Sequence, residues 1–577
     1  MQPRPENQTH RRRPPARSGR PALLLALGVA LASSAPLYYG RLGQNEQAVF
    51  LWGGAYPPDT NQYFAFLRTG YRGDWLTTNL FTSSGHAPVA LFPIHVALGH
   101  AARLYADLLA SASGRAPSAV ETIPVVYHAA RFALVIALML AIHRLARQWT
   151  ARPAIALWIV ALAAFAGGWS RDPNAETSVF RSCARNANFV WSLICHVIVC
   201  GAYLDAIGRK TGPRWRRGAA VAACGLILGW EHPFDVPPVA AAGAAALVWR
   251  WMAERRFPLR LCALTVAFLG GAAPPILYMA WLSRAVDVFR IVSSQNVLSW
   301  CYSLEWVAML DASLVVAVVG MGFLWKRRRR QANVFLILWI VTGLVVTSLP
   351  LRFNRRMIEG LPILLAFALA AAVEGALVRP LAARAVRRWR LLRGGAVFGV
   401  RASIRRRRHL AYAVTLVALL PKTLFLCYDE AIGIYRPLKD YFYLYRVELE
   451  ALEWLEAHSD WREVVWADVY RGNTIPFISG HRVYCGHSVL TDHFETRREQ
   501  TRRLFARELP VAEFRKIVRD SGIRYVYYGV RERSYDPLRR DFVSYDPQTL
   551  GTPVFRNDAV HIFRMGNGND RQERAGQ

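Results

Sequence analysis

The sequence predicts an α-helical polytopic membrane protein with about 11 transmembrane helices and a small extracytoplasmic α/β domain at the C-terminus. Two observations on composition support this prediction. Hydrophobic residues make up 53% of the 577 residues and charged residues only 19%, which is too apolar for a typical soluble enzyme of this length. Apolar runs such as residues 334–349 approach the roughly 20 residues that a membrane-spanning helix needs.

The distribution of positive charge is the third observation. Residues 429–577 contain 23 basic and 23 acidic residues, so the net charge of +32 lies entirely in the earlier part of the chain. There it falls in short connectors between apolar runs, which is typical of cytoplasmic loops and argues against a nucleic-acid partner. The connectors that we place in the cytoplasm, with the basic tail 1–20, are 143–152, 208–217, 250–260, 326–331 and 379–409.

The apolar runs between these connectors predict the spanning helices. They are 21–39, 120–142, 154–169, 189–207, 218–230, 237–250, 261–282, 307–325, 332–349, 360–378 and 410–428. Eleven crossings place the N-terminus in the cytoplasm and the C-terminus outside it, as expected in a bacterial-type inner (plasma) membrane. We therefore expect a transmembrane domain over 21–428 and an extracytoplasmic domain over 429–577.

Two apolar segments need a separate interpretation. Residues 86–109 carry three histidines, an arginine and an aspartate, so we expect an amphipathic or re-entrant helix within the first outer loop, 40–119. The first apolar run follows a basic stretch and ends in small residues, which is also the pattern of a cleavable signal. We favour a retained first helix, because it supplies the first outward crossing.

The C-terminal part has the alternation of a small α/β domain. Strands are predicted at "EVVWADVY" and "GIRYVYYGV", and helices at "HFETRREQTRRLFARELP" and "VAEFRKIVRDSG". Between them lie His481, His487, Asp492 and His493. We interpret this stretch as a hydrogen-bonded loop that covers an active site, with a metal site as the alternative.

Two outer loops carry carboxylates that could serve catalysis. Asp59, in "PPDTNQY", suits either an N-cap of a helix beginning near Thr60 or a functional role, and the two are compatible. Asp172 and Glu176 lie in the next outer loop among arginines. They form either a solvated loop or a pair that brackets a substrate hydroxyl or holds a divalent cation.

Two further segments have polar residues where the chain is otherwise apolar. "EHPFD" places Glu231, His232 and Asp235 at membrane depth, which favours a cavity or a buried partner over a simple turn. "LPLRFNRRMIEGLP" places three arginines in a loop predicted to face outward. Guanidinium groups match phosphate oxygens, so we favour anion binding over an ordinary basic loop.

No signature of a soluble enzyme is present, such as a phosphate-binding glycine loop or a zinc-protease motif. The segments instead resemble the GT-C superfamily of membrane glycosyltransferases, which includes protein O-mannosyltransferases and the catalytic subunit of oligosaccharyltransferase. The resemblance rests on "PPDTNQYFAFLRTGYRGDWLTTNLFTSSGHAPVALFPIHVALG", "NAETSVFRSCARNANF", "EHPFD", "FNRRMIEGLP" and the α/β tail. More narrowly, the layout is similar to bacterial dolichyl-phosphate-mannose-type and lipopolysaccharide-core-type transferases.

The resemblance implies sugar transfer, with inversion, from a polyprenyl-phosphate-linked donor to a hydroxyl of a glycan, lipid or protein on the outer membrane face. Asp59 would be the general base. The residues expected to bind substrate are Glu176, Glu231, His232, Arg352, Arg355 and Arg356. Several members of the superfamily place two acidic residues together in the first loop, whereas Thr60 follows Asp59 here. A second carboxylate, if one is needed, would come from Asp74, Asp172 or Glu176. No cofactor is therefore assigned, and a divalent metal at Asp172 and Glu176 stays open.

Two other functions are compatible with the sequence. Broken helices with ionisable residues also suit a secondary transporter, although the repeated halves that are common in transporters are not evident. A non-catalytic assembly or receptor protein would use the external domain to bind a partner and the helices as an anchor.

Overall fold

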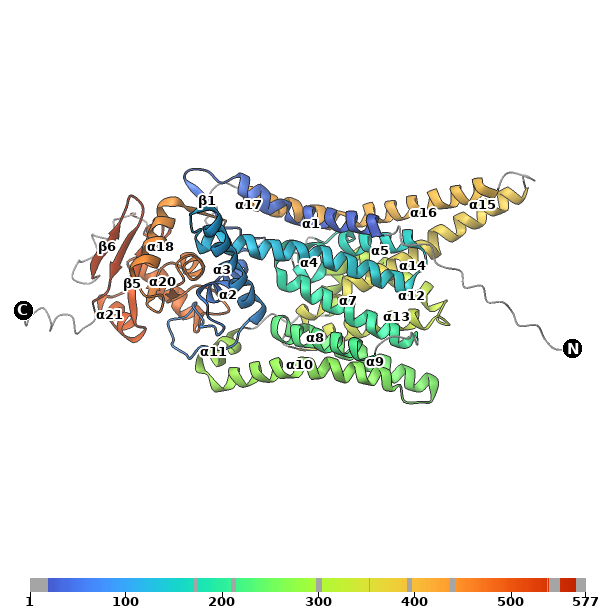
Figure 1. The fold of residues 1–577 in the computed structure, drawn as a ribbon, viewed down its shortest axis with the longest axis horizontal. Coiled ribbons are helices and arrows are strands. Elements are labelled where there is room, and N and C mark those ends of the chain that lie inside the picture. The colour runs from blue at the N-terminus through green and yellow to red at the C-terminus, as the bar shows by residue number, and fades with distance from the viewer. Residues whose placement is uncertain are drawn as a thin grey trace, which may run out of the picture.

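The computed structural model describes residues 19–54, 56–170, 174–208, 214–296, 303–351, 353–391, 397–435, 442–536, 538 and 551–566. A long bundle of helices and a smaller domain with a β-sheet lie end to end along the long axis of the molecule (Figure 1). The predicted fold class, a helical membrane protein with a small α/β C-terminal domain, is confirmed.

Each predicted spanning segment coincides with helical structure. The helices are α1 (Gly19–Leu42), α4 (Ala119–Trp149), α5 (Pro153–Phe165), α7 (Ala187–Ile207), α8 (Arg214–Glu231), α9 (Val236–Glu254), α10 (Leu259–Ala285), α12 (Ser303–Trp325), α13 (Gln331–Ser348), α14 (Leu361–Ala372), and the pair α16 (Val397–Leu419) and α17 (Pro421–Tyr435). A π-helical turn (Val373–Val378) continues α14 into α15 (Arg379–Leu391). Within the described residues, seven helices are long and apolar enough to cross a membrane, or eight if the α16–α17 pair, bent by 46°, counts as one span. The number of eleven is therefore approximate.

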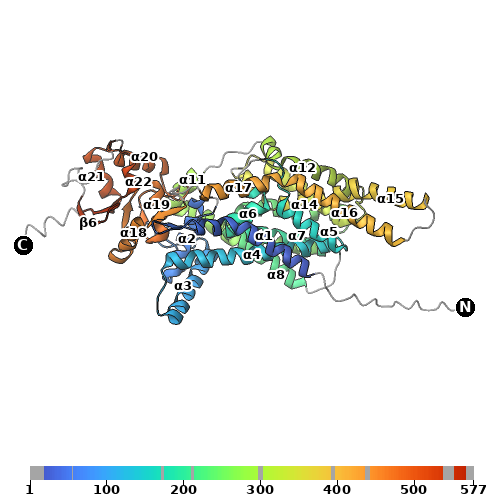
Figure 2. The same cartoon turned by 90° about the horizontal axis from the view of Figure 1, so that it is seen from above.

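The connector between α1 and α4 folds into two helices, α2 (Pro57–Arg72) and α3 (Pro93–Ser113). They cross closely because glycines meet at the contact. A Cβ added at Gly70 would lie 1.9 Å from the Val96 carbonyl oxygen, and one at Gly99 would lie 1.9 Å from the Leu67 carbonyl oxygen. In Figure 2, α3 projects across the direction of α1 and α4. It is not among the helices that qualify as spans, in agreement with the prediction of an amphipathic helix.

The sheet domain, residues 442–566, contains one five-stranded sheet. Its strands are β3 (Val464–Trp466), β4 (Arg482–Val483), β5 (Ile523–Tyr528), β6 (Thr552–Arg556) and β7 (His561–Arg564), in the order β4-β3-β5-β7-β6. Strand β3 is parallel to β4 and β5, and β7 is antiparallel to β5 and β6. The helices are α18 (Arg446–His458), α19 (Val469–Ile478), α20 (Phe494–Phe505), α21 (Val511–Asp520) and α22 (Val530–Arg533). The two predicted strands and two predicted helices are all present.

The sheet domain is attached to the connector that carries α2. Strand β1 (Ala48–Phe50) pairs with β2 (Tyr443–Tyr445) in antiparallel register. The Asn61 amide on α2 donates to Asn473 on α19 at 3.0 Å, and Arg68 donates to the Ile478 carbonyl at 2.8 Å. One hydrophobic core contains residues of α2, α4 and the sheet domain. This shared core holds the N-terminal end of α2, where Asp59 lies, against the sheet domain.

Candidate active site

Asp59 lies in the first turn of α2, and it does not cap that helix. Two prolines at Pro57 and Pro58 begin the helix after Tyr56, because proline is favoured at the first helical position. The helix therefore starts three residues before Thr60, and of the two interpretations of Asp59 the N-cap is wrong. The Asp59 side chain is 31% exposed, so it remains accessible to a substrate.

The carboxylate of Asp59 contacts two basic side chains from distant parts of the chain. Arg185 ends α6 (Val179–Arg185), and its Nη2 donates to Asp59 Oδ2 at 3.3 Å. The Arg185 guanidinium also lies over the ring of Tyr56, 5.3 Å from its centroid. His487, in the loop that follows β4, places Nε2 3.5 Å from Asp59 Oδ1. Three segments, α2, α6 and the sheet domain, therefore meet at this carboxylate.

These contacts determine the ionisation of Asp59. Burial raises the pKa of the carboxyl, but the hydrogen bond from His487 and the charge of Arg185 outweigh burial, so the pKa lies below its ordinary value. The guanidinium of Arg356 acts in the same direction. Asp59 is thus ionised at neutral pH.

Arg355 and Arg356 lie in a 3₁₀ helix, η3 (Asn354–Ile358), which we call the arginine segment. The Arg356 guanidinium stands over the ring of Phe234, 5.0 Å from its centroid, and its charge reaches Asp59. The structure therefore brings Arg356 into the surroundings of Asp59. Arg352 lies outside the described residues.

A histidine and a tyrosine that we had not assigned to the site lie beside it. Tyr63 stacks on His95, with ring centroids 4.5 Å apart. His95 Nδ1 lies 2.9 Å from Glu231 Oε2, and Glu231 also accepts the Ile94 N–H at 3.2 Å. Burial, followed by the negative charge of Asp59, raises the pKa of Tyr63 well above its ordinary value. Its position four residues after Asp59 is the one sequence signal that could have identified it, because such residues share a helix face.

His232 belongs to a second group of polar residues, which we call the buried cluster: His196, His232, Asp235 and Glu359. His232 Nδ1 lies 3.0 Å from Asp235 Oδ2 and 3.3 Å from Glu359 Oε2. The Nε2 of His196 lies 3.4 Å from the same Asp235 oxygen. All four side chains are at most 6% exposed. Glu231 and His232, adjacent in sequence, thus have different partners.

The predicted pair Asp172 and Glu176 is described only in part. Glu176 lies in η1 (Ala175–Thr177), is buried, and acts electrostatically on Glu359 of the buried cluster. Asp172 lies outside the described residues. A divalent cation held by this pair therefore stays a prediction.

The polar loop of the sheet domain does not form a metal site among its described residues. His481 contacts Ser459 and Ser479, whereas Asp492 accepts from Ser84 at 2.6 Å and from Arg497 at 2.9 Å. His481 and Asp492 therefore have partners of their own, whereas His487 contacts Asp59. The arrangement agrees with a hydrogen-bonded loop placed against the candidate site.

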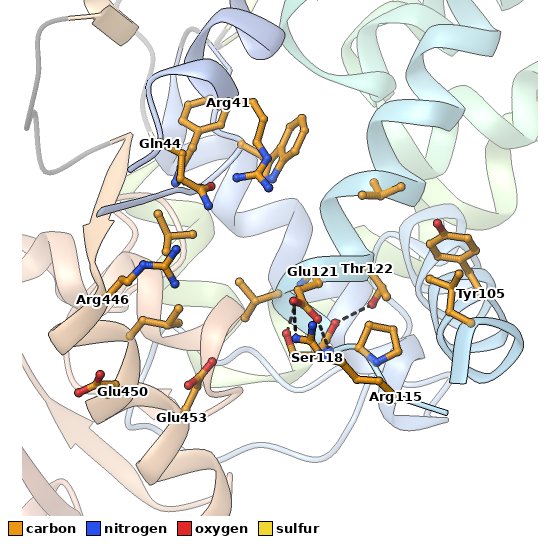
Figure 3. Close-up of a pocket in the computed structure, with 18 of the residues that line it drawn as sticks. Arg41, Gln44, Tyr105, Arg115, Ser118, Glu121, Thr122, Arg446, Glu450 and Glu453 are labelled. Carbon is orange, nitrogen blue, oxygen red and sulfur yellow. Dashed lines mark hydrogen bonds and ion pairs between the residues drawn. The ribbon is translucent and has the colours of Figure 1, made fainter. Parts of the chain in front are cut away.

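A cavity of about 910 Å³ lies elsewhere, between the ends of α1 and α4 and the sheet domain (Figure 3). On one side Arg115 and Ser118 are hydrogen-bonded to Glu121, and on the other side are Arg446, Glu450 and Glu453 of the sheet domain. None of the predicted site residues lines this cavity. Its size alone therefore does not identify the site.

No family model matches the sequence, and no curated protein matches it. Among solved structures, the apo oligosaccharyltransferase of Archaeoglobus fulgidus is similar with a TM-score of 0.50 and 13% identity, over 89% of this chain and 70% of that chain.

Two other solved structures also match. ArnT from Cupriavidus metallidurans, bound to undecaprenyl phosphate, has a TM-score of 0.48 and 14% identity, over 95% of this chain and 98% of that chain. The mycobacterial arabinofuranosyltransferase AftD has a TM-score of 0.47 and 17% identity, over 94% of this chain and 42% of that chain. The likeness to the oligosaccharyltransferase is one of fold, and this fold is the one that the resemblance to the GT-C superfamily predicts.

Proposed function

We propose that this protein is an inverting membrane glycosyltransferase that moves a sugar from a polyprenyl-phosphate donor to an acceptor hydroxyl. The observation that carries the proposal is the position of Asp59. Its carboxylate is ionised and 31% exposed, contacts Arg185 and His487, and is influenced by the charge of Arg356. A carboxylate that is open to a substrate and close to an arginine-rich segment supplies the two groups that such a transfer needs.

In the proposed reaction, the Asp59 carboxylate accepts the proton of the acceptor hydroxyl. The acceptor oxygen attacks the anomeric carbon of the donor sugar, and the bond from that carbon to the phosphate oxygen breaks on the opposite side. The leaving polyprenyl phosphate takes the bonding electron pair and gains negative charge. Arg355 and Arg356, with Arg352 as a third member, stabilise that charge through charge-assisted hydrogen bonds.

A lipid-linked donor fits the proposed placement of the site. The N-terminal helix α1 begins, and the arginine-rich helices α15 and α16 meet, at the end of the molecule opposite the sheet domain (Figure 1). By the positive-inside rule this end faces the cytoplasm, so Asp59 faces away from cytosolic nucleotide sugars. A donor carried by a polyprenyl phosphate reaches the site from the membrane. A glycan, a lipid or a protein would supply the acceptor hydroxyl.

The three remaining predicted residues act on the substrate indirectly in this proposal. Glu231 orients His95, which stacks on Tyr63 beside Asp59. His232 and Glu176 lie close to Glu359, which directly follows the arginine segment. They would therefore position the arginines that bind the donor phosphate.

The test is transfer by the Asp59→Asn variant of the full-length protein in detergent or reconstituted membranes. Labelled polyprenyl-phosphate sugars and an extract of envelope acceptors are the substrates, and the product is identified by mass spectrometry. Asp107→Asn is the matched control, because Asp107 is an exposed carboxylate of α3. Loss of transfer in Asp59→Asn alone supports the proposal. Equal transfer by wild type and Asp59→Asn removes Asp59 as the base, and ion-coupled solute flux without transfer would favour a transporter.

A further inference from the structure

The buried cluster has the ligand types and the spacing of a metal site. One ligand atom each from His232, Asp235 and Glu359 lies within 4.8 Å of the other two, and all three residues are buried. At zinc–ligand distances of about 2.1 Å, two ligand atoms of a tetrahedral site are about 3.4 Å apart. The contacts of 3.0 Å and 3.3 Å from His232 Nδ1 are close to that value. A small adjustment would therefore place these atoms around one ion.

Glu359 provides a second, independent observation. Its side chain is fully buried, and neither carboxylate oxygen accepts a hydrogen bond among the described residues. Buried carboxylates are normally hydrogen-bonded, paired or bound to a metal. Glu359 Oε2 lies 3.3 Å from His232 Nδ1. The same nitrogen also contacts Asp235. The two carboxylates therefore share one imidazole nitrogen, and Glu359 keeps oxygen atoms that a metal ion would satisfy.

His196 stands next to the three ligands. Its Nε2 is buried without a hydrogen-bond partner among the described residues, 3.4 Å from Asp235 Oδ2. Asp235 Oδ2 also accepts a short hydrogen bond from Ser192, the kind of outer contact that orients a metal-binding carboxylate. His196 therefore lies beside the group of three residues, in contact with Asp235.

We infer that His232, Asp235 and Glu359 bind a zinc ion. A mixture of imidazole and carboxylate ligands favours zinc over magnesium and calcium, which prefer oxygen ligands alone. The ion would connect the α8–α9 connection (His232 and Asp235) to the residue after η3 (Glu359). It would thereby hold the arginine segment in place.

The metal site does not depend on sugar transfer, and its primary test is metal content. Full-length protein without a histidine tag is purified in detergent from zinc-supplemented cells, dialysed against metal-free buffer and analysed by plasma mass spectrometry. We expect about one zinc per chain in the wild type, and less than about a tenth of that in His232→Ala and Glu359→Gln. His95→Ala is the matched control, because His95 is also buried and contacts a glutamate; it should keep the zinc.

Two results would overturn the inference. One is wild-type protein without bound zinc. The other is zinc that persists in both His232→Ala and Glu359→Gln, which would place the ion elsewhere. If the variants fail to fold, zinc-edge X-ray absorption of the wild type decides instead: nitrogen and oxygen ligands with imidazole scattering support the site, and sulfur ligands or no zinc signal reject it.

Discussion

Asp59 and the buried cluster use the same kinds of residue, carboxylates and histidines, in opposite surroundings. The Asp59 side chain is 31% exposed and meets Arg185 and His487 at the seam between the first connector and the sheet domain. Asp235 and Glu359 are fully buried among histidines. An accessible carboxylate can exchange a proton with a substrate. A buried carboxylate instead needs a hydrogen-bond partner, an opposite charge or a metal ion beside it. The comparison predicts that changes at Asp59 affect transfer, and that changes in the buried cluster affect stability first.

The largest expected effect is that of Asp59→Asn on the rate of transfer. Loss of a general base lowers a rate by about 10²- to 10⁴-fold. The free energy of unfolding should change by less than about 1 kcal/mol, because partly exposed ion pairs contribute little. Rates from initial velocities and melting temperatures in detergent check both parts. A large loss of stability in Asp59→Asn would contradict the comparison, which assigns Asp59 to transfer and the buried cluster to stability.

The second effect is that of Asp235→Ala on stability. Removing the carboxylate leaves His232, His196 and Ser192 without their shared partner. Breaking a buried ion pair costs about 3–5 kcal/mol, so the melting temperature should fall far more than in Asp59→Asn. Thermal unfolding in detergent measures the fall. A melting temperature equal to that of the wild type would contradict the structural role of the cluster.

The third effect is that of Gly360→Ala, which tests the backbone beside Glu359. Gly360 has a φ of +79°, and an added Cβ would lie 2.5 Å from His196 Nδ1. Backbone strain of this kind costs about 1–3 kcal/mol, and the histidine must also move. Gly28→Ala is the control, because a Cβ at Gly28 meets nothing within 4 Å. Equal melting temperatures for the two variants would show that the packing of His196 on Gly360 is unimportant.

The smallest effect is a shift of the pH profile in His487→Ala. His487 helps to hold the pKa of Asp59 below its ordinary value, so its removal raises that pKa. Transfer needs ionised Asp59 and is lost as the pH falls through this pKa. The acidic limb of the profile should therefore move to higher pH. His481→Ala should leave the limb in place, because His481 contacts Ser459 and Ser479 instead. An unmoved limb in His487→Ala would exclude His487 as a partner of Asp59.

Much of the fold followed from local patterns. Apolar runs predicted the helices of the bundle. A spanning helix must form all its backbone hydrogen bonds within itself and present apolar side chains over its length. Alternation and helical periodicity identified β3, β5, α20 and α21 for the same kind of local reason. The start of α2 was misjudged because Asp59 was considered as a cap, whereas the two preceding prolines already begin the helix.

The composition of the candidate site was only partly predictable. Asp59 and the arginine segment stood out because charges are rare in apolar surroundings. Their partners could not be identified from spacing: Arg185 lies 126 residues after Asp59, and His487 comes from the far end of the chain. Glu231 and His232 are adjacent in sequence, but α8 ends at Glu231. Glu231 therefore contacts His95, whereas His232 contacts Asp235 and Glu359.

The sequence by itself determined that the chain is a helical membrane protein and where its apolar helices lie, because hydrophobicity and loop charge act locally along the chain. It also determined that a few carboxylates, histidines and arginines are unusual for their surroundings. Only the tertiary structure decided which of them meet and which remain open to water. Contacts between segments hundreds of residues apart depend on how helices and sheet pack, and it is that packing which leaves Asp59 accessible and encloses Asp235 and Glu359.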